Sequence, residues 1–429
     1  MKVLRGVLAG IMLLQGVVQA QSVDVKVDSS PTVTVDVSNN IALLHRGEKS
    51  IEITIDQDEP VRSKTITKTF AVDRSDKLML SNQYGSIQIK TWDRNEIKAD
   101  IDVKAFSSNE GDAQELLDQV TIESGKSGDQ VFFRTKLNQN RNMGSGSRNG
   151  RRWRREVRVN YIVYMPAANA VNLSQTYGNI TMPSISGAVY AKVQYGNFTA
   201  ESLNNTNNYI SVEYGNSTIQ RLNSAVVKQQ YGSGLTIGSV GTLDLDAQYS
   251  AVNLTTIRGN ATIKQQYGSG LTIGSVENLD LDVQYASVNI NTIRGNAQIE
   301  QQYNSLAIGS VGKLSLDAQY TSATIGTLRG DGNFDMQYNK LSIGEVTTGC
   351  KALSVNAAYV GINIGFNDNY NAEIDVHTNY AGFKFADGVA AKITGTGRDS
   401  SSKDYTGKIG NGGTSRVRIN SDYGSVTFK

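Results

Sequence analysis

Residues 228–263 read KQQYGSGLTIGSVGTLDLDAQYSAVNLTTIRGNATI, and residues 264–299 read KQQYGSGLTIGSVENLDLDVQYASVNINTIRGNAQI. The two 36-residue stretches align without gaps and agree at 28 positions. A third copy begins at Glu300 and is one residue shorter, because YGSGL has become YNSL. Repetition at a fixed period in this range is typical of solenoids, propellers and linear arrays.

Each 36-residue copy contains two shorter units, and a tyrosine marks each unit. From Tyr177 to Tyr338 these tyrosines stand 17 to 19 residues apart, and the series continues more loosely on either side. Aliphatic side chains follow most of them at +3, +5 and +8, as Ile180, Met182 and Ile185 follow Tyr177. The natural unit is therefore about 18 residues long.

The spacing within a unit predicts two short strands separated by corners. Residues at +3 and +5 fall on one face of a strand, and the residue at +8 breaks that phase and marks a corner. A second pair follows, such as Leu243 and Leu245, with Asp244 and Asp246 on the opposite face. One unit cannot bury its apolar face alone, but units stacked about 4.8 Å apart can. The fold class is therefore all-β, a β-solenoid of two-strand coils of about 18 residues.

Two other β architectures fit parts of this pattern. A propeller blade needs about 40 residues and four strands, and 36 residues can hold four short ones. An outer-membrane barrel also has alternating strands, but these need roughly 9–11 residues, and the runs here are five or six residues long. The shared pattern of the two half-repeats favours the solenoid over both.

Five regions follow one another along the chain. They are a signal peptide at 1–20, an N-terminal β cap at 21–75, a first repeat-like β region at 76–165 with a short helix near 112–120 and an arginine-rich loop at 138–155, a regular solenoid at 166–365, and C-terminal coils with a cap at 366–429. The signal peptide has Lys2 and Arg5 before an apolar stretch and ends at Ala20, which predicts export. The single cysteine, Cys350, permits no intramolecular disulfide.

Several segments together resemble a known family. They are the Tyr-Gly unit within 82–93, the helical stretch 113–118, the strand 161–165 and the second Tyr-Gly unit within 175–180. This combination, spread over roughly residues 76–345, is similar to the β-strand-repeat family, common in Bacteroidetes, whose members are called adhesins by analogy. The resemblance implies an exported β-solenoid and carries over no catalytic residue, cofactor or ligand.

The arginine-rich segment gives the sharpest local signal for binding. Its seven candidate residues for an anionic ligand are Arg148, Arg151, Arg152, Trp153, Arg154, Arg155 and Arg158. Like-charge blocks of this kind are usually solvated interaction segments. Anionic glycans, lipopolysaccharide phosphates or surface proteins are the expected partners, and nucleic acid is not expected. A plain solvated loop explains the segment as well.

Three other rows of surface residues have both a structural and a binding interpretation. Arg258, Arg294 and Arg329 recur at one corner, either as turn residues paired with carboxylates or as a ladder for anionic sugars. The tyrosines either stack at one corner as an aromatic ladder that seals the core edge, or form an exposed row that stacks on sugar rings or on a partner protein. The outward aspartates form a solvated face or contact ions, but a coil between equivalent aspartates separates them by about 10 Å, too far for shared coordination.

Two functional classes remain at this point. The first is a non-catalytic scaffold with adhesin-like binding to glycans or proteins of the cell envelope or the extracellular space. The second is a β-helical enzyme that acts on polysaccharide, which needs an acid and a base in a cleft. His45 and His377 are the only histidines and are far apart, and no catalytic, metal or cofactor residue is predicted. The expected location is the periplasm, the outer membrane or the exterior.

Overall fold

A four-stranded antiparallel sheet comes first along the chain. The computed structural model describes residues 23–25, 33–38, 41–46, 49–54, 62–138, 143–148, 151–397 and 401–429. The strands of the first sheet are β1 (Val23–Val25), β2 (Val33–Ser38), β3 (Ile41–Arg46) and β4 (Lys49–Thr54), paired in that order. The signal peptide predicted at 1–20 lies outside the described residues, and the role of the sheet as a cap stays a prediction.

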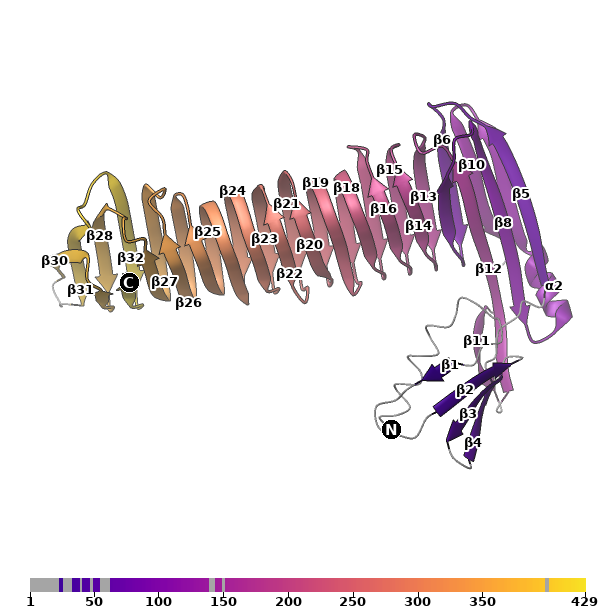
Figure 1. Cartoon of the computed structure of the whole chain (residues 1–429), viewed down its shortest axis with the longest axis horizontal. Helices are drawn as coiled ribbons and strands as arrows, with labels where there is room; N and C mark the ends of the chain where they lie inside the picture. Colours follow the sequence, from indigo (N-terminus) through magenta and orange to yellow (C-terminus); the bar gives the residue numbers. More distant parts are fainter. Residues whose placement is uncertain are drawn as a thin grey trace.

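A mixed sheet of parallel and antiparallel strands, with one helix, forms the N-terminal end of the solenoid (Figure 1). The elements are β5 (Arg62–Ala71), β6 (Lys77–Gln83), β7 (Ile87–Thr91), β8 (Glu96–Ser107), α2 (Glu110–Asp118), β9 (Val120–Ser127), β10 (Gln130–Leu137), β11 (Gly144–Arg148) and β12 (Arg151–Met165). Strand β8 pairs antiparallel with both β5 and β12. The helix expected near 112–120 is present, and the Asn109 side chain caps it by accepting a hydrogen bond from the Asp112 amide at 2.8 Å.

Parallel coils make up residues 170–366 and confirm the β-solenoid. Their strands are β13 (Ala170–Thr176), β14 (Ile180–Ile185), β15 (Val189–Gln194), β16 (Phe198–Leu203), β17 (Asn208–Glu213), β18 (Ser217–Gln230), β19 (Gly234–Gln248), β20 (Ala251–Ile257), β21 (Asn260–Gln266), β22 (Leu271–Val276), β23 (Asn278–Gln284), β24 (Val288–Gln302), β25 (Ser305–Leu328), β26 (Gly332–Val346) and β27 (Ala352–Phe366). Strand β13 pairs with β15 and β15 with β17, while β14 pairs with β16. Because pairing skips the strand that follows in sequence, the chain winds as a coil and does not close as a barrel.

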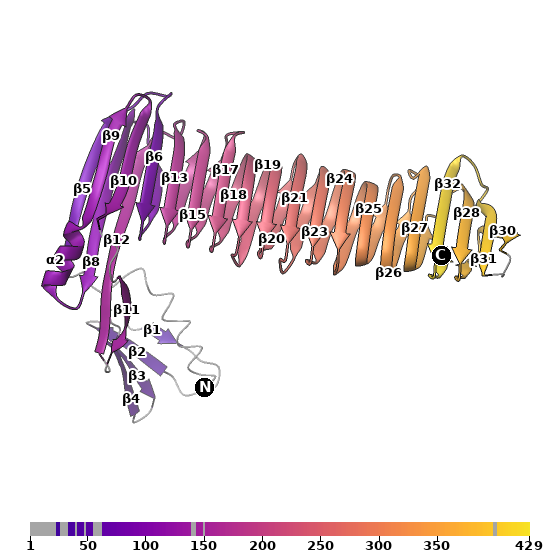
Figure 2. The ribbon, with the colours of Figure 1, turned by 180° about the vertical axis from the view of Figure 1, so that it is seen from behind.

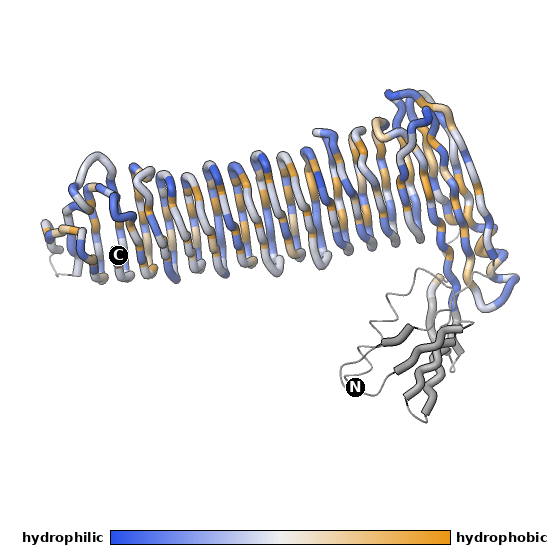
Figure 3. The backbone as a smooth tube through the Cα atoms, viewed as in Figure 1, coloured by the Kyte–Doolittle hydropathy of each residue, from blue (hydrophilic) through white to orange (hydrophobic). Residues whose placement is uncertain are grey.

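The core is a continuous aliphatic stack between the two sheets of the solenoid. Ile237 lies opposite Leu254, which lies opposite Ile273 and then Ile290, and each is at most 1% exposed. The outward residues between them are polar, so orange and blue alternate along every coil in Figure 3. The period-two pattern of the sequence therefore predicted the inward faces correctly.

The order of coils in space differs from their order in the chain at the C-terminal end. The last elements are β28 (Ala372–Asn379), β29 (Phe383–Phe385), β30 (Val389–Thr396), β31 (Ser402–Ile409), β32 (Ser415–Asp422) and β33 (Val426–Phe428). Strand β32 pairs with β27 on one side and β28 on the other, so the final coil is inserted before the preceding one. Figure 2 shows β28, β30 and β31 beyond the C-terminus. The Tyr423 unit, within the region expected to hold C-terminal coils and a cap, is thus an internal coil.

The prediction of a loop over 138–155 was wrong for its second half. Strands β11 and β12 form an antiparallel hairpin that pairs Gly144 with Arg155 and Arg148 with Arg151. Strand β12 also continues the antiparallel ladder with β8, from Arg155 opposite Ser107 onward. Backbone pairing with β11, and with β8 from Arg155 onward, thus holds this strand, although the composition of its first residues is that of a solvated segment.

Candidate functional site

A tyrosine stands at the same corner of every coil, and its backbone is in the left-handed region. Fourteen tyrosines have φ between 50° and 64°. A left-handed backbone costs roughly 1–2 kcal/mol for a residue with a side chain. Because every coil has this unfavourable backbone, we expect a contact that offsets its cost, and the stacking of the tyrosine rings is such a contact.

The fourteen rings form one continuous stack, which we call the tyrosine ladder. Neighbouring ring centroids lie 4.5–5.3 Å apart, and the ring planes differ by 2–15°. In spatial order the members are Tyr84, Tyr177, Tyr195, Tyr214, Tyr231, Tyr249, Tyr267, Tyr285, Tyr303, Tyr320, Tyr338, Tyr359, Tyr423 and Tyr380. From Tyr177 onward each is 38–58% exposed.

The tyrosines stack as a ladder and are exposed, but the ladder does not seal the edge of the core. The rings lie outside the core, whose corner is closed instead by the next residue, such as Ser250, Ala286 or Thr321, each at most 2% exposed. The ring faces are covered by the neighbouring rings, so sugars cannot stack on them along the ladder. What the ladder offers to solvent is a row of ring edges and phenol hydroxyl groups at the coil spacing.

Two sets of glutamines support the ladder. Both lie on the strand that leads into each tyrosine corner, one set facing outward and the other facing the core. An outward row lies directly before the tyrosines and pairs from coil to coil: Gln230, Gln248, Gln266, Gln284, Gln302, Gln319 and Gln337. Inward glutamines occupy every second coil beneath the turn. Gln265, fully buried, donates from Nε2 to the Ser250 carbonyl at 3.0 Å and the Gly270 carbonyl at 3.2 Å. Buried amides therefore hold the turn while outer amides extend the polar row.

Neighbouring rings raise the pKa of two ladder tyrosines. A hydrogen bond with Tyr303, and then charge repulsion from it, raise the pKa of Tyr285. Repulsion from a charged Tyr338 raises the pKa of Tyr320. Both effects favour the neutral phenols of Tyr285 and Tyr320.

Two substitutions of Tyr267 distinguish the stability that the ring stack contributes from the stability that the left-handed backbone costs. We expect Tyr267→Gly to be more stable than Tyr267→Ala by about 1 kcal/mol, because both variants lose the ring but only alanine strains a left-handed turn. Thr272 in β22 is the matched control, since its backbone is extended and alanine should be the more stable variant there. Urea denaturation measures both pairs, and the same order at the two positions would contradict the interpretation.

Arg258, Arg294 and Arg329 lie at the corner opposite the tyrosines. Arg258 donates to Ser239 Oγ at 2.8 Å, and Arg294 lies 3.9 Å from Glu277. Arg329 donates to the Ile293 and Arg294 carbonyls at 2.8 and 3.0 Å. The contacts fit turn residues, and a glycan-binding ladder at these positions stays a prediction.

The arginine-rich hairpin contains three candidate side chains within the described part of the structure. Arg154 and Arg158 each pair with Glu156, at 2.9 and 2.7 Å, and both lie over the Phe106 ring. Arg155 lies 3.6 Å from Glu115 of α2. The side chains of Arg148, Arg151, Arg152 and Trp153 lie outside the described ones. Anion binding by this segment stays a prediction.

One row of outward carboxylates is denser than the aspartates alone indicated. Asp282 and Asp317 are separated by a coil, as expected, but Glu300 fills the position between them and Asp335 extends the row. Four carboxylates thus stand one coil apart on the exposed face. Among the described residues, no group of three or more histidine, cysteine, aspartate or glutamate side chains is placed to hold a metal ion.

The remaining reactive side chains have structural partners. His377 Nδ1 lies 2.6 Å from Asp404, and burial raises the pKa of the Cys350 thiol. The side chain of His45 lies outside the described ones. No helix within the described ranges is both long and apolar enough to cross a membrane.

Two hollows on the outer surface follow the opposite corner and were not foreseen in the sequence. A groove of about 830 Å³ runs along β21 to β27 and is walled by Asn260, Asn278, Asn296, Lys313 and Asp331. A smaller cleft of about 370 Å³ lies between β6, β13, β15 and β17, beside Tyr190 and Tyr209. Tyr190 does not belong to the 18-residue tyrosine series, which is why the repeat gave no signal for it.

Comparisons with known proteins give only remote likenesses. No family model and no curated protein matches the chain. A candidate adhesin from Bacteroides fragilis is 14% identical, with 61% of this chain and 96% of that one covered and a TM-score of 0.28. A candidate cell adhesion protein from Clostridium sporogenes is 10% identical, with 86% and 99% covered and a TM-score of 0.16. A candidate lipid-binding protein from Parabacteroides distasonis is 8% identical, with 85% and 96% covered and a TM-score of 0.19. Identities and scores this low carry no argument about function.

Proposed function

We propose that this chain is an exported, non-catalytic scaffold whose long surface binds glycans of the cell envelope or the extracellular space, as an adhesin does. The tyrosine ladder carries the proposal. It presents the same uncharged hydroxyl group at every coil, next to a row of glutamine amides. Both groups donate and accept hydrogen bonds, which suits the hydroxyl groups of a sugar polymer.

Repetition supports binding to a polymer rather than to a small molecule. Fourteen rungs at about 4.8 Å extend over roughly 60 Å, so one extended chain can contact many rungs at once. Each contact is weak, with a net value of about 0.5–1.5 kcal/mol for a hydrogen bond. Contacts that act together within one ligand raise the overall affinity far above that of a single site.

A polysaccharide-acting enzyme is the alternative function. The row of Asp282, Glu300, Asp317 and Asp335 provides carboxylates one coil apart, but all four lie on an open face. A glycosidase needs two carboxyl groups in unequal environments, so that one stays protonated. Equivalent positions along a repeated face do not supply that difference.

Removal of four hydroxyl groups tests the proposal without removal of the rings. The variant combines Tyr249→Phe, Tyr267→Phe, Tyr285→Phe and Tyr303→Phe, which keeps the stack. We expect at least a tenfold weaker affinity for the polysaccharides that the unmodified protein retains on a glycan array, because four hydrogen bonds are lost. The measurement is titration by biolayer interferometry with those polysaccharides.

A control variant and an activity assay complete this experiment. Thr236→Val in β19 and Thr272→Val in β22 remove two exposed hydroxyl groups that do not belong to the ladder or its glutamine row, and should leave the affinity unchanged. Equal affinity of the phenylalanine variant, or absence of binding to any glycan, would refute the role of the ladder. Release of new reducing ends by catalytic amounts of protein would favour the enzyme instead.

A further inference from the structure

A second stacked tyrosine pair begins abruptly near the N-terminal end of the solenoid. Tyr190 of β15 and Tyr209 of β17 are neighbours in one outward column, with ring centroids 4.7 Å apart and planes 13° apart. On the other side of Tyr190 the column continues with Asn172 of β13 and then Met79 of β6. The short Asn172 side chain interrupts a column of long ones.

This interruption leaves one face of the Tyr190 ring without a stacking partner. One face of the ring is covered by Tyr209, and the opposite face is turned towards the coil of Asn172. The 370 Å³ cleft lies here, and Met79, Asn172 and Tyr190 are among its lining residues. Tyr190 is 37% exposed. Unlike the interior members of the tyrosine ladder, which have a ring on both sides, this tyrosine has a stacked ring on one side only and offers its other face to a ligand.

The width of the cleft fits one ring. Met79 and Tyr190 lie on coils that are two steps apart, which is roughly 9.6 Å at the usual spacing. Contact distances of about 3.5–4.0 Å on each side leave space for a single ring above Asn172. A second ring, or a helix, is too thick for this gap.

Polar groups surround the apolar centre of the cleft. Gln130 and Asn207 are exposed at its rim and provide amides that both donate and accept. Lys77 is held by Asp129 at 3.0 Å, and the Lys192 ammonium lies 5.3 Å from the centre of the Tyr190 ring. The rim therefore offers hydrogen bonds in several directions around a flat apolar surface.

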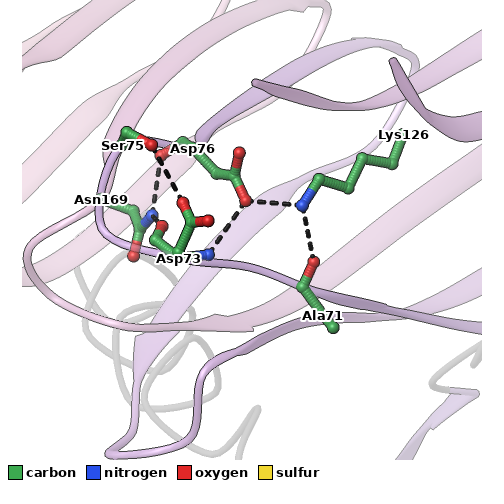
Figure 4. A network of polar contacts seen from close by, with 6 residues as sticks. All are labelled: Ala71, Asp73, Ser75, Asp76, Lys126 and Asn169. Atoms are coloured by element: carbon green, nitrogen blue, oxygen red, sulfur yellow. Dashed lines mark hydrogen bonds and ion pairs between the residues drawn. The ribbon is translucent and has the colours of Figure 1, made fainter. Parts of the chain in front are cut away.

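A polar network holds the end of the cleft in place (Figure 4). Asn169, which precedes the lining residue Ala170, donates from Nδ2 to the Asp73 and Asp76 carbonyls, each at 2.7 Å. Asp76, which precedes Lys77, accepts from Lys126 and from the Asp73 amide at 2.7 and 2.9 Å. The hydrogen bond and charge of Lys126 lower the pKa of Asp76, so the network stays intact at neutral pH. The cleft is thus formed before a ligand arrives.

From this geometry we infer that the cleft binds a single pyranose ring of a glycan, with the apolar face of the sugar against Tyr190. The C–H groups of a sugar face carry partial positive charge, and the face of an aromatic ring is negative. The hydroxyl groups at the sugar's edge then meet the amides of the rim. The inference deepens the proposed glycan binding and rests on it, since it assigns to the same ligand class a discrete site apart from the ladder.

Two opposite substitutions test the site by saturation-transfer NMR on the full chain. The probes are the methyl glycosides of glucose, galactose, mannose and glucuronic acid. We expect at least one of them to receive saturation from the protein. Tyr190→Ala should abolish this transfer because it removes the ring, and Asn172→Tyr should abolish it because a new ring fills the gap and stacks on Tyr190.

Thr236→Val is the matched control, since it changes an exposed residue of β19 that belongs neither to the cleft nor to the ladder and should leave the transfer intact. If no probe receives saturation, or if Thr236→Val reduces it as much as the cleft variants do, the inference is overturned. Continued binding of polysaccharide by a protein that fails this test would leave the ladder proposal standing. If the protein binds no polysaccharide but the probe still receives saturation at the cleft, only the ladder proposal is refuted.

Discussion

Replacement of Phe334 by alanine is expected to lower the free energy of unfolding by about 3–5 kcal/mol, the range for a fully buried phenylalanine. Phe334 in β26 is 0% exposed and lies opposite Leu316 and Val355 of the adjacent coils. Its ring also crowds Gly332 together with Leu328 and Leu353, so the space left by alanine has no neighbour free to fill it. Urea denaturation followed by circular dichroism measures the change.

The linear construction of the solenoid adds a spatial expectation for Phe334→Ala. Each coil contacts only its neighbours, so damage should remain near β25 to β27. Hydrogen exchange should lose protection there, while β7 and β14 keep theirs. Asn333→Ala, at an exposed position of the same strand, should stay within about 0.5 kcal/mol of the unmodified protein. A Phe334 variant as stable as this control would contradict a continuous packed core.

Gly196→Ala is expected to cost about 3 kcal/mol, at the upper end for an overpacked site. A Cβ atom at Gly196 would lie 1.9 Å from the Gly178 carbonyl oxygen of the adjacent coil. That oxygen belongs to the backbone and cannot turn aside as a flexible side chain does. Relief of the contact requires two coils to move apart, with loss of their shared hydrogen bonds. The midpoint of thermal or urea unfolding should fall accordingly.

Gly361→Ala is the control for this effect. Nothing lies within 4 Å of a Cβ atom at Gly361, and its backbone is not left-handed, so alanine should be neutral or slightly stabilising. The buried Val360 shows that a larger residue is accepted directly after a ladder tyrosine where the adjacent coil allows it. Equal stability of Gly196→Ala and Gly361→Ala would mean that the coils adjust more freely than the contact suggests.

The repeat was enough to predict the coil, because strand periodicity is a local property of the chain. Side chains two residues apart share a face whatever their partners, so the inward positions of Leu243 and Leu245 followed from the sequence, and they are 3% and 1% exposed. The arginine-rich segment has no such alternation, and its charge and glycine content led to the wrong prediction of a loop where β11 and β12 pair.

Contacts between coils were harder to predict from the sequence, because they depend on which strands become neighbours in space. The carboxylate row is one example. Glu300 stands at a different position of the 36-residue repeat from Asp282 and Asp317, yet in space it lies between them. The inserted coil of β32 and β33 shows it again, because insertion exchanges one set of partners for another with the same local pattern. The sequence of a single unit does not indicate whether the last coil follows the preceding one in space or is inserted before it.

The sequence by itself determined the unit: two short strands, a tyrosine corner, and aliphatic side chains that need a neighbouring coil to leave water. Only the tertiary structure decided that the tyrosines stack face to face outside the core, because their left-handed backbone is settled jointly by the turn and the adjacent coils. It also decided that Tyr190 keeps one face free. A missing neighbour is a property of three coils together, and no single stretch of the chain contains it.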